Sequence, residues 1–163
     1  MSSSYQKTFP VSWEELHRNA RALSWRLIDR RPFKGVIAIT RGGLVPAAML
    51  ARELDIRMID TVCVSTYDKQ NMGQSDVLKQ PLASDDGSGG EGWLLVDDLV
   101  DTGATARVVR ELVPNAHLAT VYAKPAGRPL VDTFVTEVSQ DTWILFPWDT
   151  AQVYAEPVVE QGE

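Results

Sequence analysis

Two short apolar runs, at residues 36–39 and 93–96, are each followed within a few positions by glycine and then by apolar residues at helical spacing. Runs of this length suit strands that are buried on both faces, as in a parallel sheet. The helical patterns cover residues 44–54, where Pro46 is tolerated in the first turn, and residues 104–113. The repeated order of strand, glycine turn and helix predicts an α/β fold with a mostly parallel, twisted sheet flanked by helices.

Other stretches extend this pattern along the chain. Ser12 and Glu15 have the spacing of a capping box, and apolar residues then recur every three or four positions as far as Leu27. This predicts a first amphipathic helix. Further strands are expected at residues 59–64, 118–123 and 134–138.

The length of 163 residues suits one domain, residues 1–163, and is too short for two ordinary domains. Residues 68–92 are rich in Gln, Asn, Ser, Asp and Gly, which predicts a mobile loop without regular structure. A loop of this length is often a lid over an active site, and a passive insertion is the alternative. Residues 143–163 are rich in aromatic, proline and acidic residues and are expected to form a small C-terminal hood over the sheet.

Composition excludes several classes of protein. The net charge of −6 argues against broad nucleic-acid binding, although local amides and a cation can still hold a phosphorylated ligand. The single cysteine, Cys63, permits no internal disulfide and no thiolate metal cluster. No signal-peptide core is present at the N-terminus, and no apolar stretch approaches the roughly 20 residues of a membrane span. These features predict a cytoplasmic protein.

The stretch at residues 94–105, Leu-Leu-Val-Asp-Asp-Leu-Val-Asp-Thr-Gly-Ala-Thr, places two carboxylates beside a phosphate-binding turn. We expect the strand to end at Val96 and the turn to cover residues 97–103. The threonine hydroxyls, the glycine and the first amides of the helix suit a phosphate dianion. The two aspartates would repel that phosphate, so they fit sugar hydroxyls or a magnesium ion nearby. The alternative is an acidic, solvated turn with an ordinary N-cap threonine.

A second strand-to-helix turn, Thr40-Arg41-Gly42-Gly43, can hold another anion through its amides and the Arg41 guanidinium. Taken alone, this turn is equally well explained as a plain tight turn. Two anion-binding turns at the carboxyl ends of neighbouring parallel strands are more informative, because ligands of open α/β sheets bind at that edge.

The stretch at 94–105 resembles the signature of the type I phosphoribosyltransferases, in which a hydrophobic strand ends in two acidic residues and runs into an Asp-Thr-Gly-x-Thr loop. Over residues 10 to 150 the chain is similar to the bacterial xanthine-guanine branch of that family, which has a serine where this chain has Thr40. The motifs that carry the similarity are residues 40–46, 60–63, 97–103, 123–129, 141–144 and 147–149.

The resemblance implies a type I phosphoribosyltransferase fold and a reaction in purine salvage. The 5-phosphoribosyl group of phosphoribosyl pyrophosphate would pass to N9 of guanine or xanthine, and of hypoxanthine more weakly, with Mg²⁺ as cofactor. The alternatives are an enzyme for hypoxanthine and guanine only, and a regulator with this fold that binds nucleic acid. The family also implies a homotetramer, with a homodimer as the alternative, and peripheral contact with the inner face of the inner membrane.

Residue by residue, the resemblance implies a site for phosphoribosyl pyrophosphate in the two turns. A non-proline cis peptide between Thr40 and Arg41 would present an amide to pyrophosphate, and Asp98 would be the protein contact of the magnesium ion. The implied contacts of phosphoribosyl pyrophosphate are Arg41, Gly42, Asp97, Asp98, Leu99, Val100, Asp101, Thr102, Gly103, Ala104 and Thr105.

The resemblance also implies a purine site. Asp101 would be the catalytic residue that takes or shares the proton of purine N7, and Lys124 would donate to the 6-oxygen. Trp143 would stack on the base, and the backbone of Ile144 would meet the 2-substituent with Asp149 nearby. Sequence alone slightly favours a core position for Trp143, and for Lys124 the alternative is a solvated surface lysine.

Two positions depart from the family pattern. The family has a lid arginine where this chain has Gly73, which leaves Lys69 or Lys79 as candidate substitutes. Leu145 replaces a glutamate that usually follows the Trp-Ile pair, so base preference is open at that point.

Overall fold

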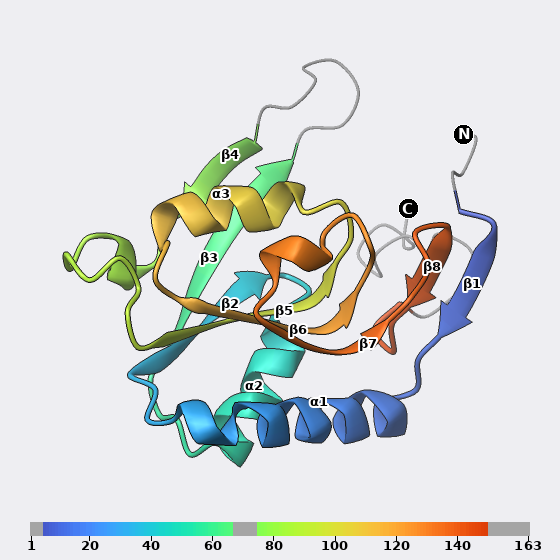
Figure 1. Cartoon of the computed structure of the whole chain (residues 1–163), viewed down its shortest axis with the longest axis horizontal. Coiled ribbons are helices and arrows are strands. Elements are labelled where there is room, and N and C mark those ends of the chain that lie inside the picture. The colour runs from blue at the N-terminus through green and yellow to red at the C-terminus, as the bar shows by residue number, and fades with distance from the viewer. Residues whose placement is uncertain (1–4, 67–74, 150–163) are drawn as a thin grey trace, which may run out of the picture.

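The computed structural model describes residues 5–66 and 75–149 of the chain (Figure 1). Six strands form the main sheet in the order β4-β3-β2-β5-β6-β7, and all neighbours are parallel except β3 and β4. The strands are β2 (Gly35–Thr40), β3 (Ile59–Thr66), β4 (Ser75–Lys79), β5 (Trp93–Val100), β6 (His117–Ala123) and β7 (Thr133–Glu137). The parallel strands β1 (Lys7–Pro10) and β8 (Thr142–Leu145) form a second, two-stranded sheet.

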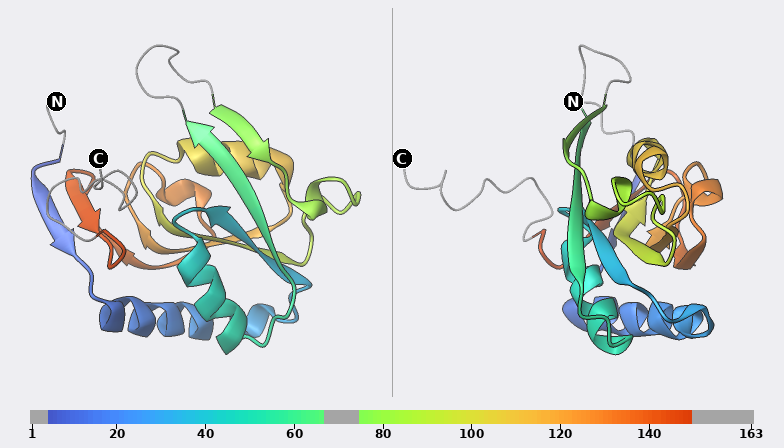
Figure 2. Two further views of the ribbon diagram at one scale, coloured as in Figure 1. Left: turned by 180° about the vertical axis from the view of Figure 1, so that it is seen from behind. Right: turned by 90° about the vertical axis from the view of Figure 1, so that its left-hand side faces the viewer.

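Three α-helices cover the main sheet: α1 (Trp13–Leu27), α2 (Leu44–Glu53) and α3 (Ala104–Leu112). α1 and α2 lie on one face and α3 lies on the other (Figures 1 and 2). Short 3₁₀ turns follow at η1 (Ile28–Arg30), η2 (Leu82–Ser84) and η3 (Arg128–Leu130). Within the described ranges, no helix has both the length and the apolarity needed to cross a membrane.

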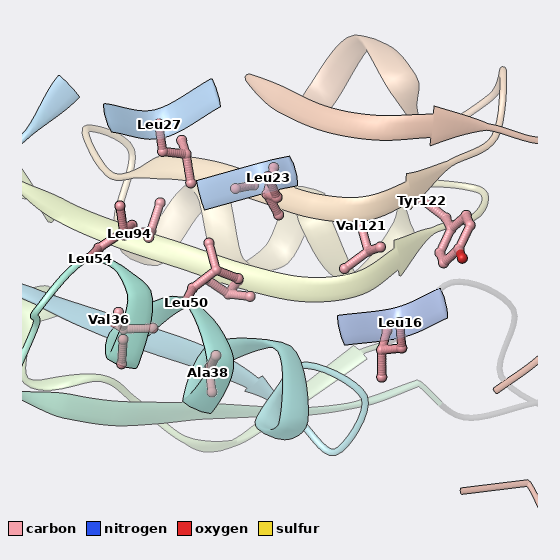
Figure 3. Close-up of a cluster of buried hydrophobic side chains, with 14 of the residues drawn as sticks. Leu16, Leu23, Leu27, Val36, Ala38, Leu50, Leu54, Leu94, Val121 and Tyr122 are labelled. Carbon is pink, nitrogen blue, oxygen red and sulfur yellow. The ribbon is translucent and has the colours of Figure 1, made fainter. Parts of the chain in front are cut away.

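Side chains of the central strands alternate between two cores. Val36 and Ala38 of β2 pack with α1 and α2, while Ile37 and Ile39 pack with α3. Figure 3 shows the first of these clusters, with Leu23 and Leu50 contributed by the two helices. Because both faces of the strands are covered, the uninterrupted apolar run in the sequence is explained.

The predicted first helix is confirmed, with a cap as expected. The Ser12 Oγ accepts a hydrogen bond from the Glu15 amide at 3.1 Å, which satisfies one of the amides left free at a helix start. Leu16, Leu23 and Leu27 are buried along one face of the helix. The predicted α/β class with a mostly parallel sheet is also confirmed.

Three expectations need correction. β5 runs on to Val100 rather than ending at Val96, because its pairing with β6 continues through Asp97, Leu99 and Val100. The acidic pair therefore lies on the strand and not in the turn. The predicted structureless loop at 68–92 contains β4, which pairs with the edge of β3 and so satisfies its backbone groups, and the 3₁₀ turn η2. The first part of the predicted lid, residues 68–74, lies outside the described residues.

The third correction concerns the hood. Its first residues belong to β8, and β8 pairs in parallel with β1 from the other end of the chain. Sequence reasoning predicted no strand at β1. Residues 150–163 of the predicted hood lie outside the described residues.

The connections place a topological switch point between β2 and β5. From β2 the chain passes through α2 to β3 on one side, and from β5 it passes through α3 to β6 on the other side. Open α/β sheets bind ligands in the crevice outside the strand ends at such a point. Both predicted anion-binding turns lie here.

Candidate active site

The turn after β2 lies directly against the acidic pair of β5. Ala38 is the last residue of β2 that pairs with β5, and it lies opposite Val96, directly before the acidic pair. A Cβ built on Gly42 would stand 2.4 Å from Asp98 Oδ2, which is closer than real contacts allow. Only glycine therefore lets the Asp98 carboxylate lie against this turn. The Thr40–Arg41 peptide is cis, as the family resemblance implied, and Arg41 is exposed.

If the protein uses phosphoribosyl pyrophosphate, as the family resemblance implies, we expect Gly42→Ala to weaken its use. The new methyl group has to displace the Asp98 carboxylate, and overpacking of this kind costs about 1–3 kcal/mol. The KM for phosphoribosyl pyrophosphate should rise about tenfold, which corresponds to about 1.4 kcal/mol. Steady-state kinetics at saturating guanine measure this.

A double-mutant cycle with Asp98→Ala tests the cause. If Gly42→Ala acts by moving the carboxylate, it should change KM little once that carboxylate is absent. Effects that add fully in the double variant would contradict this explanation.

Burial disfavours the charged form of both carboxylates in the acidic pair. The Asp98 amide donates to Asp97 Oδ1 at 2.9 Å. Removal from solvent raises the pKa of Asp97 well above its usual range, and the charge of Asp98 raises it further. Removal from solvent likewise raises the pKa of Asp98. A positively charged ligand at this point would relieve both effects.

The part of the chain that the structure describes has no group of three or more His, Cys, Asp or Glu side chains that could hold a metal ion. An ion at Asp98 would therefore take most of its oxygen ligands from water or from a bound ligand, which is how proteins usually hold Mg²⁺. The donor chemistry of Asp98 fits that role.

The turn after β5 forms the predicted phosphate loop at the start of α3. Gly103 has a φ of 88°, a backbone conformation that favours glycine, and α3 begins at the next residue. A cavity of about 220 Å³ opens at this loop and is lined by Ile39, Asp97, residues 99–106, Leu118 and Thr120. The first amides of a helix have no partner within the helix and attract anions, so this cavity suits a phosphate group.

Asp101 and Lys124 meet one residue beyond the ends of β5 and β6. The Lys124 amide donates to the Val100 carbonyl at 2.9 Å, which continues the pairing of the two strands. The Lys124 Nζ lies 2.9 Å from Asp101 Oδ2, and the lysine side chain is only 1% exposed. The alternative of a solvated surface lysine is therefore wrong. A buried ammonium needs a partner, and Asp101 supplies it.

Two residues at this site were missed by sequence reasoning. The Gln140 Nε2 donates to Asp101 Oδ1 at 2.6 Å, while its Oε1 accepts from the Ala126 amide at 3.0 Å. Gln140 thus joins Asp101 to the loop that follows Lys124. Tyr5 donates its hydroxyl hydrogen to Asp101 Oδ2 at 2.8 Å. Gln140 stands directly before the motif at 141–144, which was a usable signal, whereas no pattern in the sequence marks Tyr5.

β8 carries the remaining predicted base contacts. Trp143 is 48% exposed, so the core position that sequence alone favoured is wrong. Its ring centroid lies 5.1 Å from that of Tyr5. The Ile144 side chain is 4% exposed and packs in the core, so only its backbone can face a ligand, as predicted. Asp149 accepts from the Phe146 amide at 3.1 Å and closes the turn after β8.

A family model described as the phosphoribosyl transferase domain matches residues 12–155, which include both anion-binding turns, Lys124 and Trp143. The chain belongs to the phosphoribosyltransferase family. A phosphoribosyltransferase from Desulfotalea psychrophila, named xanthine-guanine phosphoribosyltransferase, is 65% identical over 98% of this chain and 97% of its own length. A protein of the same name from Nitratidesulfovibrio vulgaris is 64% identical over 98% of this chain and 95% of its own length.

Solved structures of phosphoribosyltransferases support the same fold. The purine phosphoribosyltransferase of Pyrococcus horikoshii superposes with a TM-score of 0.76 at 27% sequence identity, covering 91% of this chain and 99% of that one. The predicted type I phosphoribosyltransferase fold is thereby confirmed.

The structure bears on the first departure from the family pattern, which is the question of which lysine could substitute for the lid arginine. The Lys79 Nζ donates to Asp60 Oδ1 at 2.9 Å, to the Thr61 carbonyl at 2.7 Å and to the Gln80 carbonyl at 3.2 Å. All three ammonium hydrogens are thus committed to β3 and the end of β4, which argues against Lys79 as a substitute for the lid arginine. Lys69 and Gly73 lie outside the described residues. Leu145 is half-buried on β8, opposite Pro10.

Proposed function

We propose that the protein is a purine salvage enzyme that transfers the 5-phosphoribosyl group from phosphoribosyl pyrophosphate to N9 of guanine or xanthine, and to hypoxanthine more weakly. Pyrophosphate is the other product. The observation that carries this proposal is the pairing of Asp101 with the buried Lys124, because it joins the phosphate loop to a side chain suited to a 6-oxopurine. The names of relatives at 63–65% identity support the choice of bases.

The two turns divide the sugar phosphate between them. The amides of residues 102–105 and the start of α3 hold the 5-phosphate, while Arg41 and the amides beside Gly42 hold the pyrophosphate. Asp97 and Asp98, between the two turns, accept hydrogen bonds from the ribose hydroxyls. Asp98 is the residue that would hold Mg²⁺, and the bound ion would supply positive charge and Lewis-acid chemistry for the departure of pyrophosphate.

The reaction forms the bond between purine N9 and the anomeric carbon and breaks the bond between that carbon and the pyrophosphate oxygen. Asp101 takes the N7 proton as N9 attacks, so the base does not build up positive charge. The protein mainly aligns the two reactants and stabilises charge around an oxocarbenium-like carbon.

Base selection falls to Lys124 and β8. An ammonium only donates hydrogen bonds, so Lys124 favours the 6-oxygen of guanine, xanthine and hypoxanthine over the 6-amino group of adenine. The ring of Trp143, a residue that is 48% exposed, stacks on the base. The Ile144 backbone and Asp149 lie near the 2-substituent, which distinguishes guanine and xanthine from hypoxanthine.

Steady-state rates with xanthine, guanine, hypoxanthine and adenine test the proposal, measured with Mg²⁺ and again with a chelator. We expect turnover with the three 6-oxopurines, hypoxanthine being the weakest, little turnover with adenine, and loss of activity without Mg²⁺. Failure with xanthine alone would favour a hypoxanthine-guanine enzyme. No turnover with any base would favour a nucleic-acid-binding regulator, against which the net charge of −6 speaks.

The assembly and location that we propose follow the family. A homotetramer is expected, with a homodimer as the alternative, and light scattering distinguishes the two. We place the enzyme in the cytoplasm with peripheral contact at the inner face of the inner membrane, which flotation with anionic vesicles tests.

A further inference from the structure

Tyr5 touches each of three residues that the proposed function assigns to the base. Its hydroxyl donates to Asp101 Oδ2 at 2.8 Å, the Lys124 Nζ stands 4.4 Å from its ring centroid, and its ring lies 5.1 Å from that of Trp143 at an interplanar angle of 60°. These contacts join the N-terminal segment to residues from three separate parts of the chain. Tyr5 stands two residues before β1, which pairs with β8 and so holds the segment beside Trp143.

The position of Tyr5 conflicts with a bound base. A purine that contacts Asp101, Lys124 and Trp143 together must lie on the side of Trp143 that faces Asp101, and Tyr5 already lies there. A base between the two rings would need about 3.5 Å on each side, or roughly 7 Å between centroids. The 5.1 Å between Tyr5 and Trp143 leaves no room for it.

We propose that Tyr5 occupies the purine site of the free enzyme and has to leave before a base or a nucleotide product can bind. The inference rests on the proposed function, since it takes Asp101, Lys124 and Trp143 as the base contacts. Tyr5 imitates the base in three respects: an aromatic ring against Trp143, a ring face under the Lys124 ammonium, and an O–H directed at Asp101 in place of the purine N7–H.

The chemistry of the contact explains why Tyr5 stays in place. The Lys124 side chain is fully buried and the Asp101 side chain is partly buried. If neither Tyr5 nor a base were present, Asp101 would lose a hydrogen bond and Lys124 would lose its contact with an aromatic ring. The hydrogen bond to Asp101, with removal from solvent and the aspartate's charge, raises the pKa of Tyr5 to about 12. The phenol therefore keeps the proton that it donates.

Equilibrium binding of GMP and of ribose 5-phosphate tests the proposal in wild type, Tyr5→Ala, Tyr5→Phe and Lys7→Ala. GMP needs the base site, whereas ribose 5-phosphate needs the phosphate loop and the acidic pair but not the base site. If Tyr5 occupies the site, removing it raises the competent fraction of the enzyme, and the apparent Kd for GMP should fall about fivefold in Tyr5→Ala. Tyr5→Phe, which keeps the ring and loses the hydrogen bond, should show a smaller fall.

Lys7→Ala is the matched control, because Lys7 lies in the same segment and its side chain pairs with Asp141 at 3.6 Å. Lys7→Ala should leave the affinities for GMP and for ribose 5-phosphate unchanged. Tyr5→Ala should leave the affinity for ribose 5-phosphate unchanged. Unchanged or weaker GMP binding in Tyr5→Ala would overturn the proposal and indicate that Tyr5 lines the base site without blocking it. The proposed function is tested separately, by measuring whether the wild-type enzyme turns over guanine.

A second measurement uses the wild-type chain. Chymotrypsin cleaves after accessible aromatic residues, so GMP should accelerate cleavage at the Tyr5–Gln6 bond if binding expels the ring, and ribose 5-phosphate should not. Protection of that bond by GMP would contradict the proposal.

Discussion

Asp101→Asn is expected to lower kcat with guanine by about 100- to 1,000-fold, the lower part of the range that a lost general acid or base produces. Asparagine keeps the shape of the side chain and one oxygen acceptor, but it cannot take the N7 proton. It also removes the negative charge that lies 2.9 Å from the Lys124 ammonium. Because the phosphate loop is left intact, the affinity for ribose 5-phosphate should stay within about twofold of wild type. Single-turnover rates and equilibrium binding measure the two effects.

Asp55→Asn supplies a matched control for this variant. Asp55 makes an exposed pair with Arg57 and has a φ of 53°, which asparagine tolerates well. Its kcat should equal that of wild type. An Asp101→Asn enzyme with wild-type turnover would remove Asp101 from the proton transfer and leave it only the task of holding Lys124.

Lys124→Met is expected to weaken GMP binding by about 10- to 100-fold, while ribose 5-phosphate binding stays unchanged. Methionine fills a similar volume at a position that is 1% exposed, so packing is largely kept. The variant loses the donor to the 6-oxygen and leaves Asp101 without its ionic partner. Discrimination between guanine and adenine should fall at the same time, because no ammonium remains to disfavour the amino group. Equilibrium binding and kcat/KM for the two bases provide the measurement.

Lys79→Met is the matched control, since Lys79 also lies 2.9 Å from an aspartate but at the edge formed by β3 and β4. It should change neither binding constant. Equal losses of GMP and ribose 5-phosphate affinity in Lys124→Met would show that the lysine supports the phosphate loop rather than selecting the base. Thermal unfolding of both variants shows whether they are folded at the assay temperature, so a loss of affinity can be distinguished from a loss of folded protein.

Local patterns predicted the positions of the two strand-to-helix turns well, because each turn is built from consecutive residues. Gly42 and Gly103 were identified from their positions between strand and helix, and the structure adds the close approach of Asp98 and the φ of 88° that explain them. The end of β5 was placed four residues too early. An apolar run marks only the covered part of a strand, whereas backbone pairing with β6 continues into residues whose side chains face the ligand edge.

The purine site was predicted only in part, because it is assembled from distant segments. Lys124 and Trp143 were assigned through the family resemblance, but the burial of Lys124 and the exposure of Trp143 were not foreseen. Gln140 and Tyr5 reach Asp101 from 39 and 96 positions away along the chain. Short-range periodicity carries no information about such contacts.

The sequence by itself determined the alternation of buried strands and amphipathic helices, the two glycine-containing strand-to-helix turns and the family. These features depend on hydrophobic spacing, on glycine and on neighbouring residues, all of which can be read locally. Only the tertiary structure decided that β1 pairs with β8, that Asp101 pairs with Lys124, and that Tyr5 contacts Asp101, Lys124 and Trp143. Strand pairing and the neutralisation of a buried charge depend on which segments the sheet brings together, and that is a property of the whole fold.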